Sequence, residues 1–193
     1  MQTLPAGNYL ATVDAPFVRM WRGFLTGRVM VALALLVLQG AGQIINQVAD
    51  PTVLALCVAY LVATVALRVL ARQGPPSPGA GPQWLPSIGL DLAAITAMQL
   101  LHAGTMNYTP LFGLPILMAA VLGTLTLALG TTAGVTLLLL GWAWWMGART
   151  GEDDAQRYLQ SALTGTGYFI VSYLVHQLAT RLAREQEVAQ QSQ

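Results

Sequence analysis

The sequence predicts an all-α, polytopic membrane protein: a bundle of six transmembrane helices with both termini in the cytoplasm. Composition is the first reason for this fold class. Hydrophobic residues make up 55% of the 193 residues and charged residues only 9%, whereas soluble domains carry about 25% charged residues. The second reason is arrangement, because the apolar residues gather in runs near the roughly 20 residues that a membrane-spanning helix needs.

Six apolar runs follow one another between short polar segments. The predicted helices cover residues 24–45, 52–71, 85–103, 109–128, 131–147 and 156–180. The fourth and fifth runs are nearly continuous and together far too long for one crossing at about 1.5 Å per residue. We therefore predict a turn near Gly130, with residues 1–23 as a cytoplasmic segment and 181–193 as a cytoplasmic exit helix. The proline- and glycine-rich stretch 74–82 predicts a connector between the second and third helices.

Arginine placement sets the predicted orientation, since cytoplasmic loops are enriched in basic residues. The chain has no lysine, and its nine basic residues are all arginine. Seven of them fall on the side that holds both termini: Arg19, Arg22, Arg28, Arg68, Arg72, Arg181 and Arg184. That side is therefore predicted to be cytoplasmic. The segment GWAWWMG (141–147) then lies at the outer interface, where tryptophan is enriched.

A single acidic residue, Asp91, lies inside the third predicted helix. A carboxylate at the bilayer centre costs about 2.5–3.5 kcal/mol on insertion scales, so such residues usually have a partner or a function. Arg28, a few residues into the first predicted helix, and Arg68, near the end of the second, are expected at a similar depth. We predict that Asp91 pairs with Arg28, with Arg68 as second choice. The alternative is that Asp91 reaches the headgroup region alone.

Small residues at four-residue spacing predict where helices approach one another. Membrane helices associate through such residues because lipid tails are as apolar as leucine. The pairs are Gly23 and Gly27, Gly130 and Gly134, and Ser161 and Gly165. We predict that these faces contact other helices rather than lipid, although Gly130 could simply form the turn. Pro110 and Pro115 predict a helix start with one kink, or alternatively a broken helix of the kind found in carriers.

The sequence shows no catalytic, metal or cofactor site. His102 and His176 are predicted at opposite faces of the membrane, so they cannot share a metal, and each is interpreted as an interfacial histidine. The lone Cys57 is interpreted as a small apolar residue. A net charge of +1 gives no basic surface for nucleic acid. We therefore predict no cofactor in this chain and no catalysis by it alone, with the lipid bilayer as its evident partner.

The last predicted helix continues past the membrane edge with apolar residues at helical spacing. Leu178, Leu182 and Ala189 form a near-heptad seam within HQLATRLAREQEVAQ. Such a seam is typical of a parallel coiled coil between two copies of a helix. We therefore predict a homodimer with the sixth helix near its axis, and a helix that leads into a further cytoplasmic domain.

Three segments carry a family resemblance: GLDLAAITAMQLLHAG, NYTPLFGLPILMAAVLGTLTLALGTTAGVTLLLL and YLQSALTGTGYFIVSYLVHQLATRLAREQEVA. They resemble the six-helix membrane domain of PilS-type sensor histidine kinases, over roughly residues 20–190. The shared features are an acid early in the third helix, here Asp91, an LP-containing fourth helix, here with Pro115, and a charged helical exit after the sixth helix. The resemblance rests on helix number and pattern rather than on an active-site signature.

The resemblance implies a homodimeric sensing module in a bacterial inner membrane. Its tail would continue into an ATP- and Mg-dependent protein-histidine kinase core, which would signal to a response regulator. The implied membrane cue is the transmembrane helix of a pilin-like or other membrane protein. These 193 residues contain neither a phosphoaccepting histidine motif nor glycine-rich ATP-binding boxes, and His176 is not a phosphorylation site. The alternative function is a small six-helix channel or carrier, which the helical exit and the lack of a polar pathway disfavour.

Overall fold

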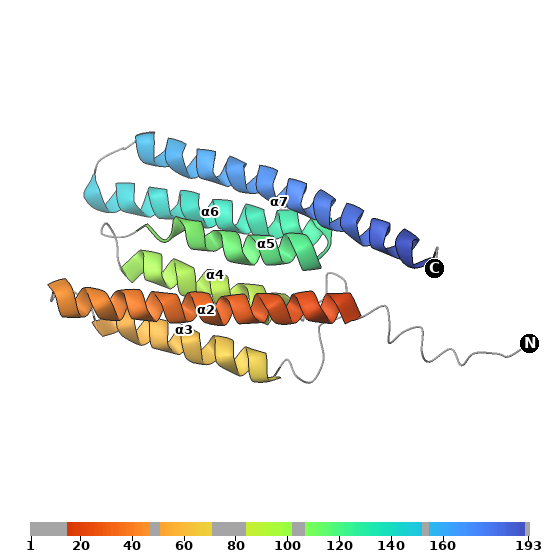
Figure 1. Ribbon diagram of the computed structural model, residues 1–193. Coiled ribbons are helices and arrows are strands. Elements are labelled where there is room, and N and C mark those ends of the chain that lie inside the picture. Colours follow the sequence, from red (N-terminus) through yellow and green to blue (C-terminus); the bar gives the residue numbers. More distant parts are fainter. Residues whose placement is uncertain (1–14, 47–50, 71–83, 102–106, 152–154, 192–193) are drawn as a thin grey trace, which may run out of the picture. The chain divides into compact units, whose positions relative to one another are not determined.

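The computed structural model describes residues 15–46, 51–70, 84–101, 107–151 and 155–191. Within these ranges the chain forms six α-helices and one short 3-10 helix, which confirms the predicted all-helical class (Figure 1). The chain divides into two compact units, residues 1–76 and 77–193. The predicted connector 74–82 and His102 lie outside the described residues.

The first unit is a pair of packed helices, α2 (Ala15–Asn46) and α3 (Pro51–Leu70). The buried face of α3 consists of Val53, Cys57, Tyr60 and Thr64. Their three- and four-residue spacing places all four on one side of the helix. Cys57 is therefore a buried packing residue, and the Thr64 hydroxyl donates to the Leu61 carbonyl at 2.9 Å.

Helix α2 begins at Ala15, so the prediction that residues 1–23 precede the first helix is wrong for its last part. The reason is amphipathicity rather than uniform hydropathy. Trp21 and Leu25 are buried at helical spacing, while Arg19 and Arg22 are exposed on the other side. A sequence window that scores apolar content alone stops at these arginines, but a two-sided helix accommodates them.

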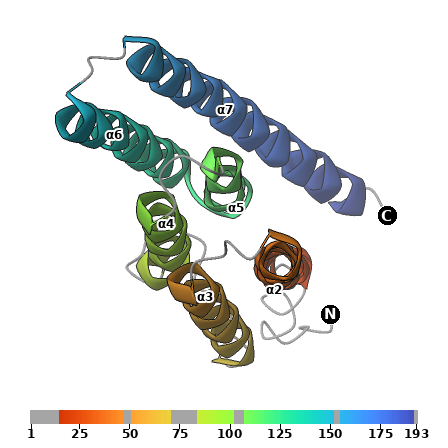
Figure 2. The same ribbon diagram turned by 90° about the vertical axis from the view of Figure 1, so that its left-hand side faces the viewer.

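The second unit contains α4 (Trp84–Leu101), the 3-10 helix η2 (Thr109–Phe112), α5 (Gly113–Leu122), α6 (Leu125–Thr150) and α7 (Ala155–Gln191). Figure 2 shows α5 enclosed by α4, α6 and α7. Most of α5 is buried, including Ile116, Met118, Ala119 and Ala120. With 10 residues, α5 is about 15 Å long, half the roughly 30 Å thickness of a bilayer core. It is a central helix that contacts protein on most of its surface.

The turn between the fourth and fifth predicted helices lies at Gly123 and Thr124, so its prediction near Gly130 is wrong. A Cβ atom at Gly123 would lie 2.6 Å from the Ala119 carbonyl oxygen, so only glycine allows the chain to fold back there. Thr124 then caps α6 by accepting a hydrogen bond from the Leu127 amide at 3.3 Å.

The residues that follow Gly130 continue α6, and their hydroxyls bond within the helix. Thr131 donates to the Leu127 carbonyl at 2.8 Å, and Thr132 donates to the Ala128 carbonyl at 2.9 Å. Two glycine–threonine pairs lie in this stretch of the sequence, at 123–124 and 130–131. Only the geometry of the backbone distinguishes the pair that begins a helix from the pair inside one.

Both prolines of the TPLFGLP segment lie at helix beginnings. Pro110 lies in the first turn of η2, and Pro115 lies in the first turn of α5. Proline is tolerated there because amide groups in a first turn have no partner within the helix. The fourth membrane segment is thus a 3-10 turn that leads into a short α-helix.

Three helices of the described chain are long and apolar enough to cross a membrane on length and composition alone: Val18–Gly42, Pro51–Leu70 and Leu125–Thr150. The segments Pro86–Leu101 and Thr109–Leu122 are shorter apolar helices. Helix α7 runs without interruption from Ala155 to Gln191, past the predicted membrane edge at residue 180. The cytoplasmic location of both termini stays a prediction from arginine placement.

Candidate functional site

Asp91 lies in the middle of the buried face of α4. Most other members of this face are apolar and recur at three- or four-residue spacing: Trp84, Ile88, Ala94, Ile95 and Met98. Ser87, four residues before Asp91, is a buried polar member. Asp91 itself is 0% exposed. Asp91 is thus enclosed by protein, and the alternative that it reaches the headgroup region alone stays untested beside the predicted pair. An ionised group at such a position needs a hydrogen-bonded or charged partner.

Arg28 is a matching buried cation on α2. It is 1% exposed and belongs to the buried face that also contains Leu25, Ala32 and Leu35. Arg28 lies within Val18–Gly42, the part of α2 that is long and apolar enough to cross a membrane on length and composition alone. Arg68 is exposed in the last turn of α3, which makes it the weaker candidate. The pairing of Asp91 with Arg28 stays a prediction.

A polar stripe that sequence reasoning missed runs along the inner face of α7. Gly165, Tyr168, Ser172 and His176 recur at three- and four-residue spacing, so they lie on one side of the helix. Ser172 is 0% exposed, and its hydroxyl has no hydrogen-bond partner among the described residues. This face of α7 packs against α5 and α6.

Two side chains of this stripe bond to the backbone of η2 and α5. The Tyr168 hydroxyl donates to the Thr109 carbonyl at 2.6 Å, and His176 Nδ1 lies 2.9 Å from the Ala120 carbonyl oxygen. Ala120 lies in the last turn of α5, where the reversal at Gly123 leaves carbonyl groups without helical partners. With a proton on Nδ1, His176 therefore caps α5, and Tyr168 holds the beginning of the same segment.

These contacts add to the interpretation of His176. Its side chain joins α7 to α5, and its location at a membrane interface stays a prediction. A long-range hydrogen bond of this kind leaves no local pattern in the sequence. The signal that could have suggested it is the shared face of Tyr168, Ser172 and His176, three polar residues at three- and four-residue spacing. No group of residues suited to hold a metal ion occurs in the described ranges.

Replacing Tyr168 with phenylalanine should destabilise the protein, because the buried Thr109 carbonyl loses its donor while the ring is kept. The expected cost is about 1–3 kcal/mol of unfolding free energy. Tyr173→Phe is the matched control, since Tyr173 is 47% exposed, and its expected effect is within about 0.5 kcal/mol. Thermal unfolding in detergent compares the two, and equal melting temperatures would contradict a role for the Tyr168 bond.

The predicted small-residue pairs differ in whether another helix lies close to them. A Cβ atom at Gly165 would lie 2.5 Å from Thr136 Cγ2 and 2.8 Å from Thr136 Oγ1. Gly165 thus marks a close approach of α7 to α6, and Ser161 lies one turn before it on the same face. At the other four glycines a Cβ atom would meet nothing within 4 Å: Gly23, Gly27, Gly130 and Gly134.

Helix contact at those four glycines stays a prediction, since no described atom lies within 4 Å of a Cβ atom there. For α2 the reason for this open space is rotational. Gly23 and Gly27 each lie two residues after a buried residue, Trp21 and Leu25, and two residues correspond to about 200° around a helix. The large side chains on the opposite face of α2 are buried instead.

The outer face of α7 is apolar and exposed. Leu163, Ile170, Leu174, Leu178 and Leu182 are between 50% and 72% exposed. Ala189 and Glu185 are exposed in the same part of the helix, beyond the predicted membrane edge. The side opposite the polar stripe is thus covered by nothing in the described chain, and it continues the predicted seam.

Comparison with protein families gives one match. The model of the PilS-like transmembrane domain matches residues 18–189, from the first turns of α2 almost to the end of α7. The chain belongs to the PilS-like transmembrane domain family. Curated proteins and solved structures gave no match. As a PilS-like transmembrane domain, the chain is a multi-pass membrane module of the PilS sensor kinase family.

Within the PilS-like domain, the features described above separate into two groups. Arg28 in the first unit, and Asp91 and the polar stripe of α7 in the second, are buried or bond to the backbone of another helix. The exposed apolar face of α7 forms part of the outer surface and continues toward the end of the helix at Gln191.

Proposed function

We propose that this PilS-like domain is the sensing and dimerisation module of a two-component sensor histidine kinase in a bacterial inner membrane. The observation that carries the proposal is the continuity of α7, which is one helix from Ala155 to Gln191. Its inner face is attached to α5 and α6, and its outer face continues beyond the bundle. A rearrangement of the packed helices would therefore move the cytoplasmic end of α7.

The proposed output is a change in register or rotation between two copies of α7. The seam of Leu178, Leu182 and Ala189 is weak, because Glu185 and Ala189 contribute little apolar area. A weak coiled coil suits a switch, since a membrane ligand shifts an equilibrium only by its differential affinity for the two states. Arg181 and Arg184 are exposed where anionic headgroups would attract them.

The proposed partners follow from family membership. They are a second copy of the domain, a pilin-like or other transmembrane helix as the cue, and a response regulator reached through the kinase core. ATP and Mg would bind only that core, which lies outside these 193 residues. The family match favours this role over a small channel or carrier. In the gene, a phosphoaccepting histidine helix and ATP-binding boxes are expected beyond Gln193.

Cysteine cross-linking in native membranes tests the dimer axis. In a Cys57→Ser background, single cysteines at 178, 182 and 189 are expected to form disulfides between protomers. Cysteines at 62 on α3 and 137 on α6 are matched controls, because Val62 and Leu137 are 62% and 70% exposed. The two control variants are expected to form no disulfides between protomers. Cross-links at the control positions and none on α7 would show that the axis lies elsewhere and that this output route is wrong.

A further inference from the structure

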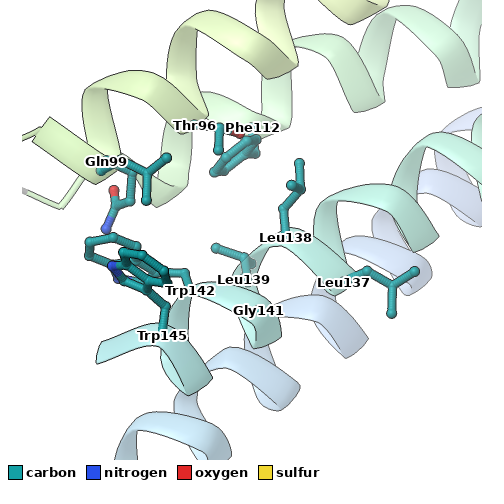
Figure 3. Close-up of a pocket in the computed structure, with 10 residues that line it drawn as sticks. Thr96, Gln99, Phe112, Leu137, Leu138, Leu139, Gly141, Trp142 and Trp145 are labelled. Atoms are coloured by element: carbon teal, nitrogen blue, oxygen red, sulfur yellow. The ribbon is translucent and has the colours of Figure 1, made fainter. Parts of the chain in front are cut away.

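A pocket of about 390 Å³ lies between α4 and α6, beside η2. This volume is within the range of small-molecule sites, roughly 300–1,000 Å³. Figure 3 shows three aromatic side chains around it, Phe112, Trp142 and Trp145, together with leucines of α6. The pocket lies entirely within the second unit, and it includes none of the residues to which a role is assigned above.

The lining of the pocket favours an uncharged ligand. None of the described residues that line it carries a charge, and its polar side chains are Thr96 and Gln99 of α4 and the indoles of Trp142 and Trp145. Thr96 and Gln99 are three residues apart, so they lie on the same face of α4. An ionic ligand would lose its hydration in this pocket without gaining a counter-charge.

The Thr96 hydroxyl is a buried donor without a partner among the described residues. Other threonines within the helices satisfy their hydroxyls locally. Thr132 and Thr136, for example, donate to carbonyl groups four residues earlier at 2.9 Å. Thr96 is different because its hydroxyl makes no such bond. Inside a bilayer no bulk water replaces that bond, so an unpaired hydroxyl is suited to donate a hydrogen bond to a bound ligand.

The orientation of Gln99 is fixed by the backbone. Its Oε1 accepts a hydrogen bond from the Tyr108 amide at 3.2 Å. Because a backbone amide only donates, this contact distinguishes Oε1 from Nε2. The amide nitrogen of Gln99 then points toward the tryptophans, as Figure 3 shows. Thr96 and Gln99 both offer donors, and the complementary ligand group is an acceptor such as a carbonyl oxygen.

The rim of the pocket consists of exposed side chains. Leu100 is 49% exposed and Leu137 is 70% exposed. Trp145 is 42% exposed, and the Arg149 guanidinium lies over its ring at 4.7 Å from the centroid. That cation–π contact holds the indole at the rim. A ligand would therefore enter sideways from the bilayer, past leucine side chains.

We propose that this pocket binds an uncharged, lipid-soluble ring carbonyl compound. The ring would lie against Phe112 and Trp142, and the carbonyl oxygen would accept hydrogen bonds from Thr96 and Gln99. Flat aromatic walls favour a planar ring, since offset stacking adds to the area that is buried. The proposal is independent of the signalling role, because it rests only on the pocket.

A decyl-substituted 1,4-benzoquinone is the probe, with decylbenzene as the matched compound that lacks carbonyl groups. Binding is measured in lipid nanodiscs by quenching of tryptophan fluorescence. Saturable quenching is expected from the quinone. Quenching that rises linearly with concentration would mean partition into lipid only and would overturn the proposal. Competition experiments compare the affinity of decylbenzene with that of the quinone. Equal affinities would overturn the proposed hydrogen bonds to the carbonyl oxygen.

Two variants with matched controls locate the site. Gly141→Leu places a side chain in the pocket and should abolish saturable quenching. Gly130→Leu should leave the quenching unchanged, because nothing lies within 4 Å of a Cβ atom at Gly130. Thr96→Val keeps the shape and removes the hydroxyl, so the affinity should fall roughly three- to tenfold. Thr164→Val is the control for Thr96→Val, because the exposed Thr164 hydroxyl donates to the Gln160 carbonyl of its own helix. Unchanged affinity in Gly141→Leu, with its melting temperature retained, would place the probe elsewhere and overturn the proposal.

Discussion

Asp91→Asn is expected to lower the unfolding free energy of the domain by about 3–5 kcal/mol, the range for breaking a buried ion pair. Removing the carboxylate would leave the predicted partner, Arg28, as a buried charge with less compensation. Arg28→Gln should cost a similar amount. Both side chains are almost completely buried, at 0% and 1% exposed, so water would not replace the missing partner.

A double-mutant cycle tests the pairing itself. If Asp91 and Arg28 form a pair, Asp91→Asn combined with Arg28→Gln should cost much less than the sum of the single variants. Arg68→Gln is the control, since Arg68 is exposed and should neither destabilise the domain by itself nor couple to Asp91. Melting temperatures in one detergent provide the comparison. Additive effects of Asp91 and Arg28 would refute the pair, and coupling to Arg68 would support the second choice instead.

Among the glycines of the predicted small-residue pairs, Gly165→Leu should be the most damaging substitution. Even a Cβ atom would lie 2.5 Å from Thr136 Cγ2 and 3.2 Å from Thr136 Cβ. Thr136 cannot easily turn away, because it is β-branched and its hydroxyl donates to the Thr132 carbonyl at 2.9 Å. Overpacking of this kind costs about 1–3 kcal/mol, and leucine adds three more carbons beyond the clash.

Gly167→Leu is the matched control, because nothing lies within 4 Å of a Cβ atom there. Its melting temperature should stay close to that of the parent protein. Adding Thr136→Ala to Gly165→Ala should restore part of the lost stability, since two of the three nearest atoms are removed. Equal stability of the two leucine variants would show that α7 does not approach α6 closely at Gly165.

Hydropathy and arginine placement were sufficient to predict the helices but not their ends. Long apolar runs identify six helices because the cost of exposing backbone in lipid leaves few alternatives. The beginning of α2 at Ala15 and the turn at Gly123 were missed because local packing decides them. At Gly123 the deciding contact is the Ala119 carbonyl oxygen, a detail that a sequence window does not contain.

The residues of the candidate site were predictable only where chemistry alone singles them out. Asp91 and Arg28 are conspicuous because charges in apolar runs are rare. Tyr168 and His176 were not recognised as contacts, because their partners are backbone carbonyls 59 and 56 residues away. Any tyrosine or histidine offers the same donor, and only the folded path of η2 and α5 shows which carbonyl groups need one.

The dependence of α5 on α7 has a consequence for biosynthesis. Residues 113–122 leave the ribosome before Tyr168 and His176 have been made, and these side chains satisfy the Thr109 and Ala120 carbonyls. A helix of about 15 Å with unsatisfied ends is a poor independent insert in a bilayer core of roughly 30 Å. We therefore expect α5 to reach its final depth only after α7 has been inserted. With a single cysteine introduced into α5 in a Cys57→Ser background, a nascent chain stopped before Ala155 should leave that cysteine accessible to water-soluble thiol reagents. Release of the full chain should protect it.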